Sequence, residues 1–198
     1  MNMAEETAHL AKYMIAHALR DPVSEYILNV RRDLSERFSI PVSKNPPHIT
    51  MKYSFEPSDM HDLSQVESIL SDFRDSHVPA MFTFEHFSHF HNPNVIYLYP
   101  SVSPGMRMAH HDLMRGLKRL PWMSWDEHEG KGIHFHATLA RMDISSGLLT
   151  RMASYLETLP RPHFECMFNS VTLYKRESPA PLNNGEGLLI PVKAYSLR

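Results

Sequence analysis

Alternating apolar and polar positions predict several short β-strands. Residues 82–87 alternate apolar and polar in strand fashion, and residues 95–99 form a second apolar run after the Asn-Pro-Asn turn at 92–94. A period of two places one set of side chains in a core and the other on the opposite face. Because a short turn joins them, these two segments predict a β-hairpin. Further strands are expected at residues 24–30, 48–55, 136–142, 165–174 and 187–197.

Helical spacing of apolar residues predicts the elements between these strands. A Pro-Ser-Asp cap opens a helix that ends near residue 76, and Ser103-Pro104 opens another that runs to about residue 120. Asp143 or Ser145 caps a third. Residues 31–38 fit a short helix or turn. A weaker pattern predicts a helix at residues 4–20, so we expect an N-terminal helical extension (residues 1–23) followed by one domain (residues 24–198).

Two His-x-Thr tripeptides lie within the predicted strands. The first comprises His48 and Thr50, after a stiff Pro-Pro lead, and the second comprises His136 and Thr138. In each strand the histidine and threonine share one face, and their apolar neighbours point the other way, into a core. The two strands could therefore present two imidazoles and two hydroxyls to a single anion.

The order of elements repeats around the two tripeptides. A His-x-Thr strand, a capped amphipathic helix and a hairpin occupy residues 48–99 and again residues 136–197. A duplicated unit would place its two active strands about a pseudo-two-fold axis. The sequence therefore predicts an α+β fold of two pseudo-symmetric lobes, with antiparallel-rich sheets and outer helices around a central cleft.

Composition narrows the class of protein. Apolar residues make up 42% of the 198 residues, and the formal net charge of −2 excludes a strongly basic coat protein for nucleic acids. The sole cysteine, Cys166, forms no internal disulfide, and its apolar neighbours favour a structural thiol over a nucleophile. No stretch is apolar enough to span a bilayer, and the start does not have the pattern of a secretory signal. We expect a cytoplasmic monomer.

Paired histidines suit the chemistry of phosphodiester opening. The reaction needs a base to deprotonate the attacking oxygen and an acid to protonate the leaving oxygen. Histidine is the side chain that titrates near neutral pH without perturbation, so two imidazoles in opposite protonation states could do both without a metal or other cofactor. Thr50 and Thr138 could hydrogen-bond the non-bridging phosphate oxygens, most strongly in the transition state.

The segments Pro-His-Ile-Thr at 47–50 and His-Ala-Thr at 136–138, with their spacing and surrounding elements, resemble the 2H phosphoesterases. These include the 2′-5′ RNA ligase-like (LigT-like) proteins and cyclic phosphodiesterases. The strand at 171–174 is also similar, and the resemblance covers about residues 24–198. It implies a LigT-like fold, with His48 as proton donor and His136 as the base. The implied substrates are RNA ends or nucleotides with a 2′,3′-cyclic phosphate or a 2′-5′ linkage.

Three further residues are weaker candidates for substrate binding. Lys52 shares a predicted strand face with His48, so it either meets a phosphate or is solvated. His134 lies beside His136 on one face and suits a supporting or substrate-contacting role. Tyr174 could stack on a base, as aromatic residues do in single-stranded RNA sites, although packing is the simpler interpretation.

Two alternative functions stay open from the sequence. A binding module could use the same site to recognise a nucleotide or RNA end without turnover. A metal-dependent hydrolase could use other histidines, such as those at 86, 89 and 91 or the pair at 110–111. The sequence has no His-Glu-x-x-His or paired-cysteine pattern, so we expect no metal site.

Overall fold

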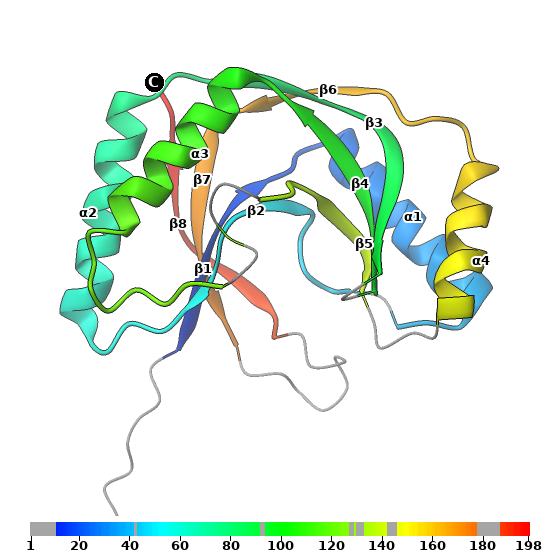
Figure 1. Ribbon diagram of the computed structural model, residues 1–198, viewed down its shortest axis with the longest axis horizontal. Helices are drawn as coiled ribbons and strands as arrows, with labels where there is room; N and C mark the ends of the chain where they lie inside the picture. The colour runs from blue at the N-terminus through cyan, green and yellow to red at the C-terminus, as the bar shows by residue number, and fades with distance from the viewer. Residues whose placement is uncertain are drawn as a thin grey trace, which may run out of the picture.

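The computed structural model describes residues 11–41, 43–91, 94–126, 129, 133–141, 146–177 and 187–198. Two antiparallel four-stranded sheets stand side by side, with helices on their outer faces (Figure 1). One cluster of buried apolar side chains runs through both sheets and against all four helices. The α+β prediction of two sheets with outer helices is therefore confirmed. No helix in the described part of the chain combines the length and apolar character needed to cross a bilayer.

The first sheet, sheet A, has the strand order β2-β1-β7-β8. Its strands are β1 (Lys12–Ala18), β2 (His48–Phe55), β7 (Ser170–Arg176) and β8 (Leu189–Ser196). The second sheet, sheet B, has the order β5-β4-β3-β6. Its strands are β3 (Ala80–His91), β4 (Asn94–Val102), β5 (Ala137–Arg141) and β6 (Phe164–Phe168). Each His-x-Thr segment thus lies on the edge strand of a different sheet.

Four helices cover the two sheets. Helices α2 (Met60–Ser76) and α3 (Pro104–Leu117) lie beside sheet A, and α1 (Val23–Phe38) and α4 (Ser146–Glu157) lie beside sheet B (Figure 1). The predicted caps of the second and third helices are confirmed, because Asp59 accepts from the Asp62 N–H and Ser103 accepts from the Met106 N–H. The predicted caps of α4 at 143–145 lie outside the described residues.

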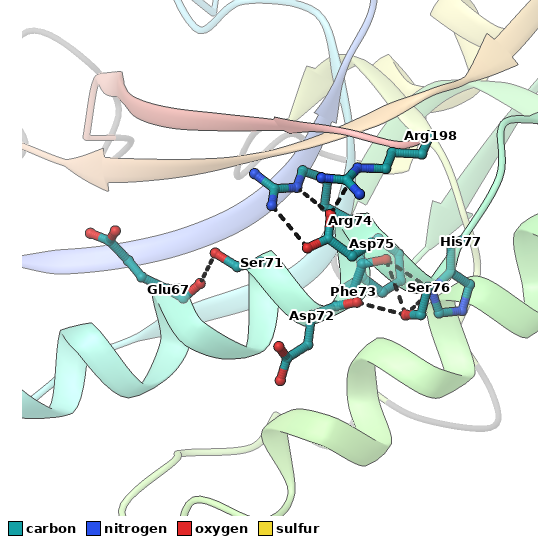
Figure 2. A network of polar contacts seen from close by, with 9 residues as sticks. All are labelled: Glu67, Ser71, Asp72, Phe73, Arg74, Asp75, Ser76, His77 and Arg198. Atoms are coloured by element: carbon teal, nitrogen blue, oxygen red, sulfur yellow. Dashed lines mark hydrogen bonds and ion pairs between the residues drawn. The ribbon is translucent and has the colours of Figure 1, made fainter.

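The end of α2 also anchors the last strand. Arg198 Nε lies 3.1 Å from the Asp75 carboxylate, which Arg74 contacts from the neighbouring position (Figure 2). The Arg198 N–H donates to the carbonyl of His77, directly after the helix. These contacts fix the end of β8 against α2 and thereby hold the helix beside sheet A.

Several predicted elements are wrong. Residues 12–18 form β1 between β2 and β7, so they belong to the sheet rather than to a helical extension; residues 1–10 lie outside the described residues. Residues 24–30 were expected as a strand but lie in α1. The helix expected at residues 31–38 is confirmed. The strand expected at 165–174 is two strands, with β6 in sheet B and β7 in sheet A. Helix α3 ends at Leu117, short of residue 120.

Candidate active site

The first His-x-Thr segment follows the strand alternation that its sequence predicts. Ile49 and Met51 are fully buried in the core, whereas His48 and Thr50 are half-buried on the other face of β2. The imidazole of His48 is held by its own strand, because Nδ1 donates to the carbonyl of Pro46 at 2.8 Å. The stiff proline pair therefore positions the ring as well as the strand.

The second segment repeats this geometry at the start of β5. Phe135, Ala137 and Leu139 are buried, and His136 and Thr138 are half-buried between them. The ring of His136 is held in the same way as that of His48, since its Nδ1 donates to the carbonyl of His134 at 2.7 Å. In both segments, the anchoring carbonyl lies two residues before the histidine.

These hydrogen bonds fix the tautomer of both rings. A carbonyl oxygen only accepts, so Nδ1 of each histidine must carry the proton. The Nε2 atom of each neutral ring then carries a lone pair and can accept a proton. His48 and His136 thus present chemically equivalent nitrogens, one from each sheet.

The two edge strands are brought together by a buried arginine of α1. Strands β2 and β5 lie in contact, and the guanidinium of Arg31 reaches both catalytic segments. Its Nη1 donates to the carbonyl of Asn45 at 2.6 Å, and its Nε and Nη2 donate to the carbonyl of Thr138 at 3.1 and 2.7 Å. Arg31 is only 3% exposed. The planar guanidinium thus links the segment before His48 to the strand that carries Thr138.

Burial and nearby positive charge both disfavour protonation of these histidines. Burial lowers the pKa of His48 to about 4 against the opposing effect of its hydrogen bond to Pro46. The positive charge of Arg31 lowers the pKa of His48 further, and a protonated His136 acts in the same direction. The pKa of His136 is also lowered, chiefly by burial.

An aromatic wall in sheet B packs against the second histidine. The ring centroid of His136 lies 5.4 Å from those of Phe90 and Tyr97, which lie 4.4 Å from each other. Tyr97 is paired with Thr138 across β4 and β5, so these side chains share a sheet face. The exposed ring of His134 also contacts Phe90, at 5.9 Å, which places His134 beside the same wall.

Tyr174 lies on the catalytic face of sheet A. Thr50 and Thr172 both pair with Ala16 of β1, so all three face the same way, and Tyr174 follows Thr172 by two positions on β7. Tyr174 is 3% exposed and packs with Met14 in a small apolar cluster separate from the main core. Its phenol therefore lines the face that carries the first His-x-Thr segment.

Lys52 does not face the catalytic site, contrary to the prediction. A register irregularity between β1 and β2 breaks the alternation, so that Met51 and Lys52 are both buried. The Lys52 ammonium is fully buried and forms an ion pair of 2.9 Å with Glu129. Glu129 also accepts from the Tyr53 N–H. Lys52 therefore fixes Glu129 against β2.

The described residues contain no group of three His, Cys, Asp or Glu side chains that could hold a metal ion. His89 and His91 lie close, with Nε2 atoms 3.2 Å apart, but both are exposed on β3. His110 donates instead to the carbonyl of Met51. The half-buried Cys166 has its thiol pKa raised to about 11 by burial, so it is protonated at neutral pH.

Comparison with known proteins agrees with this geometry. The family model of the 2′-5′ RNA ligase superfamily matches residues 19–180. The chain belongs to this superfamily of 2H phosphoesterases. The resemblance carried by the two His-x-Thr segments is therefore confirmed. No curated protein sequence matches the chain.

Solved structures of the superfamily share the fold at low sequence identity. The Thermus thermophilus protein TT0787 aligns with a TM-score of 0.69 at 17% identity, covering 94% of this chain and 98% of that chain. Escherichia coli LigT in its apo form aligns with a TM-score of 0.68 at 17% identity, covering 96% and 99%. LigT complexed with ATP gives 0.65 at 21% identity, covering 94% and 98%. The LigT-like fold is thus confirmed.

Sequence reasoning missed Arg31 and the aromatic wall. Arg31 occupies a position on the buried stripe of α1, which includes Ile27 and Leu34, and a charged residue at such a position signals a buried polar contact. Tyr97 and Phe90 gave no comparable signal, because their contact with His136 depends on the pairing of β5 with β4.

Proposed function

We propose that this superfamily member is a metal-independent phosphoesterase that acts on RNA ends or nucleotides. Its reactions would be the opening of 2′,3′-cyclic phosphates or the cleavage and joining of 2′-5′ linkages. The observation that supports the proposal is the equivalent anchoring of His48 and His136, each through Nδ1, which leaves a proton-accepting Nε2 on each ring. An acid–base pair of this kind needs no metal to move the two protons.

The proposed reaction assigns one proton transfer to each histidine. His136 accepts a proton from water as the water oxygen bonds to phosphorus, and His48 donates a proton to the ribose oxygen as its bond to phosphorus breaks. The hydroxyls of Thr50 and Thr138 donate to the non-bridging oxygens, where negative charge grows in the transition state. In the reverse direction, the same groups would join two ends.

Substrate binding itself would help to set the protonation states. Both imidazoles are predominantly neutral at pH 7 in the free protein, because their pKa values are lowered. A phosphate between them would raise these pKa values, since an anion favours the protonated form of a neighbouring imidazole. The two rings would then share one proton, as the acid–base scheme requires.

The ligands bound in the structural relatives support a nucleotide substrate. Escherichia coli LigT has been crystallised with ATP and with 3′-AMP. Our proposal extends nucleotide binding to this chain on the strength of the shared fold and of the two His-x-Thr segments. We also propose that the protein acts as a cytoplasmic monomer.

The test is turnover of 2′,3′-cyclic nucleotides, 2′-5′ oligoadenylate and 3′-5′ RNA by purified protein, with the released phosphate isomer resolved. His48→Ala and His136→Ala should each lower turnover by roughly 10²- to 10⁴-fold, because each removes one proton-transfer group. His89→Ala is the matched control, since this histidine is exposed on β3. Full activity in either catalytic variant would refute the mechanism.

The same assay separates the alternatives. Activity that survives a chelator agrees with the proposal, whereas loss with EDTA and recovery with zinc would identify a metal-dependent hydrolase. Tight nucleotide binding without product would identify a binding module. Thr50→Val and Thr138→Val should each lower kcat by roughly 10- to 100-fold with little change in KM, because the lost hydrogen bond acts mainly in the transition state.

A further inference from the structure

A cavity lies beside the segment that leads to His136. It has a volume of about 400 Å³ and is formed between α3 and the segment that leads into β5. Exposed Arg107, Arg115 and Lys118 surround it, and Met114 and Phe135, both buried, contribute its apolar surface. Sites that bind small organic groups usually begin at about this size. We call it the α3 cavity.

One extended segment separates the α3 cavity from the catalytic histidines. Ile133 and Phe135 line the cavity. The rings of His134 and His136 instead contact Phe90 in the aromatic wall. Because neighbouring side chains of an extended segment point in opposite directions, this segment faces the cavity on one side and the catalytic site on the other.

The charge of the α3 cavity is suited to an anion. Arg107, His111, Arg115 and Lys118 lie three or four positions apart, so they follow one face of the helix. Among the residues that the structure describes, no carboxylate lines the cavity. Arg115 pairs with Asp112 at 2.7 Å, on the same helix. The three positive charges of Arg107, Arg115 and Lys118 contrast with the net charge of −2 of the chain.

Aromatic and apolar groups accompany the cations. The Lys118 ammonium lies 5.5 Å from the ring of Trp125, which is 38% exposed. On the inner side, Phe135 packs edge-on against His110 at 5.1 Å, and His110 Nε2 donates to the carbonyl of Met51 on β2 at 3.1 Å. The α3 cavity is therefore formed by residues held firmly to the strand of the first His-x-Thr segment.

We propose that the α3 cavity is a second subsite, which binds a phosphate and base of an RNA strand beside the linkage held by His48 and His136. This inference rests on the proposed function and narrows its substrate to an oligonucleotide. Sites for single-stranded nucleic acids combine a cationic path for phosphates with aromatic faces for bases. The α3 cavity has the cations and, in its lining, the ring of Phe135, while Trp125 lies beside Lys118; a single cyclic nucleotide in the catalytic site would leave the cavity empty.

The test compares a 2′,3′-cyclic mononucleotide with a short RNA oligonucleotide that ends in a 2′,3′-cyclic phosphate. The variant is Arg107→Gln with Lys118→Gln, two exposed helical positions where glutamine keeps helix propensity. For the oligonucleotide, KM should rise roughly tenfold at low salt with kcat unchanged. Each lost phosphate contact should also flatten the dependence of log KM on log salt by roughly 0.7. For the mononucleotide, neither KM nor kcat should change.

The matched control is Arg119→Gln with Arg151→Gln, which removes the same charge from exposed positions that do not line the cavity. An unchanged oligonucleotide KM in the cavity variant, or an equal change in the control, would overturn the proposal. So would equal losses on both substrates.

A binding measurement distinguishes this inference from the proposed function. If the wild-type protein turns over neither substrate, the proposed function fails. Fluorescence anisotropy of the labelled oligonucleotide then still tests the α3 cavity. A roughly tenfold weaker affinity in the cavity variant alone supports the subsite, and equal affinities overturn it.

Discussion

Replacing Arg31 with methionine tests whether the contact between the two catalytic strands is needed for catalysis. The variant removes the donors to the carbonyls of Asn45 and Thr138 and keeps most of the side-chain volume. It also removes a charge that lowers the pKa of His48. Arg31→Lys is the partner variant, because an ammonium keeps the charge but cannot present the same rigid fork to two carbonyls.

The size of the effect follows from two carbonyls that lose a buried charged donor. At about 1–2 kcal/mol for each, the free energy of unfolding should fall by about 2–4 kcal/mol. For a chain of this length, such a loss lowers Tm by roughly 4–16 °C. A shift of about 1 Å between the two imidazoles should lower kcat by roughly 10²-fold. The lysine variant should lose kcat to a similar extent.

The decisive measurement is the pH profile of kcat/KM, taken well below Tm. Removing the guanidinium should raise the pKa of His48 and move the limb of the profile that reports it to higher pH in the methionine variant, whereas the lysine variant should stay near wild type. A purely structural role would lower Tm and leave both kcat and the profile unchanged. That result would refute the positioning role of Arg31.

Three other perturbations have defined outcomes. Lys52→Met should destabilise the fold by about 3–5 kcal/mol, because it leaves the Glu129 carboxylate buried without its partner, and a double variant with Glu129→Leu should recover most of this loss in urea unfolding. No recovery would contradict this account. Burial lowers the pKa of both His17 and His110 to about 4, so stability is complete above about pH 6.5 and falls by up to ~3 kcal/mol for each as pH drops toward 4. A Tm independent of pH in this window would contradict it. The pKa values of His48 and His136 are both lowered, so the pH profile of kcat/KM should be bell-shaped and centred below pH 6.5. If bound phosphate raises these pKa values, the pH profile of kcat should lie at higher pH than that of kcat/KM.

The sequence predicted the two His-x-Thr strands well because their signals are local. His48 and Thr50 alternate with two core residues along the strand. This alternation alone predicts that His48 and Thr50 are half-exposed and that the two core residues are buried. The capped helices were predicted for the same reason, since a cap and a stripe of apolar residues lie within one short segment. The contact between the two edge strands could be predicted only from the repeat of the tripeptide.

The predicted elements are wrong where the apolar positions of one segment fit both a helix and a strand. Residues 12–18 form a strand that is covered on both faces and is buried along nearly its whole length. Such a strand has apolar residues at almost every position, so these residues also fit the spacing of a helix. In α1, Val23, Ile27 and Leu34 belong to a helical stripe, but the β-branched residues at its start also fit a strand.

The contacts of Lys52 and Arg31 could not be predicted from local sequence patterns. The burial of Lys52 depends on a register irregularity against β1 and on Glu129, which lies 77 positions away. The role of Arg31 depends on Thr138, 107 positions away. Such partners become apparent only when the strand order is known.

The strand order of sheet A affects how the polypeptide can fold as it is synthesised. Strand β1 pairs with β7, which follows it only after β2 to β6 along the chain. Sheet B, by contrast, uses strands that follow one another more closely along the chain. The nascent chain must therefore hold β1 with one unpaired edge until β7 has left the ribosome, and this edge is exposed to aggregation during that interval. A chaperone that shields β1 would act on this protein during translation rather than after it.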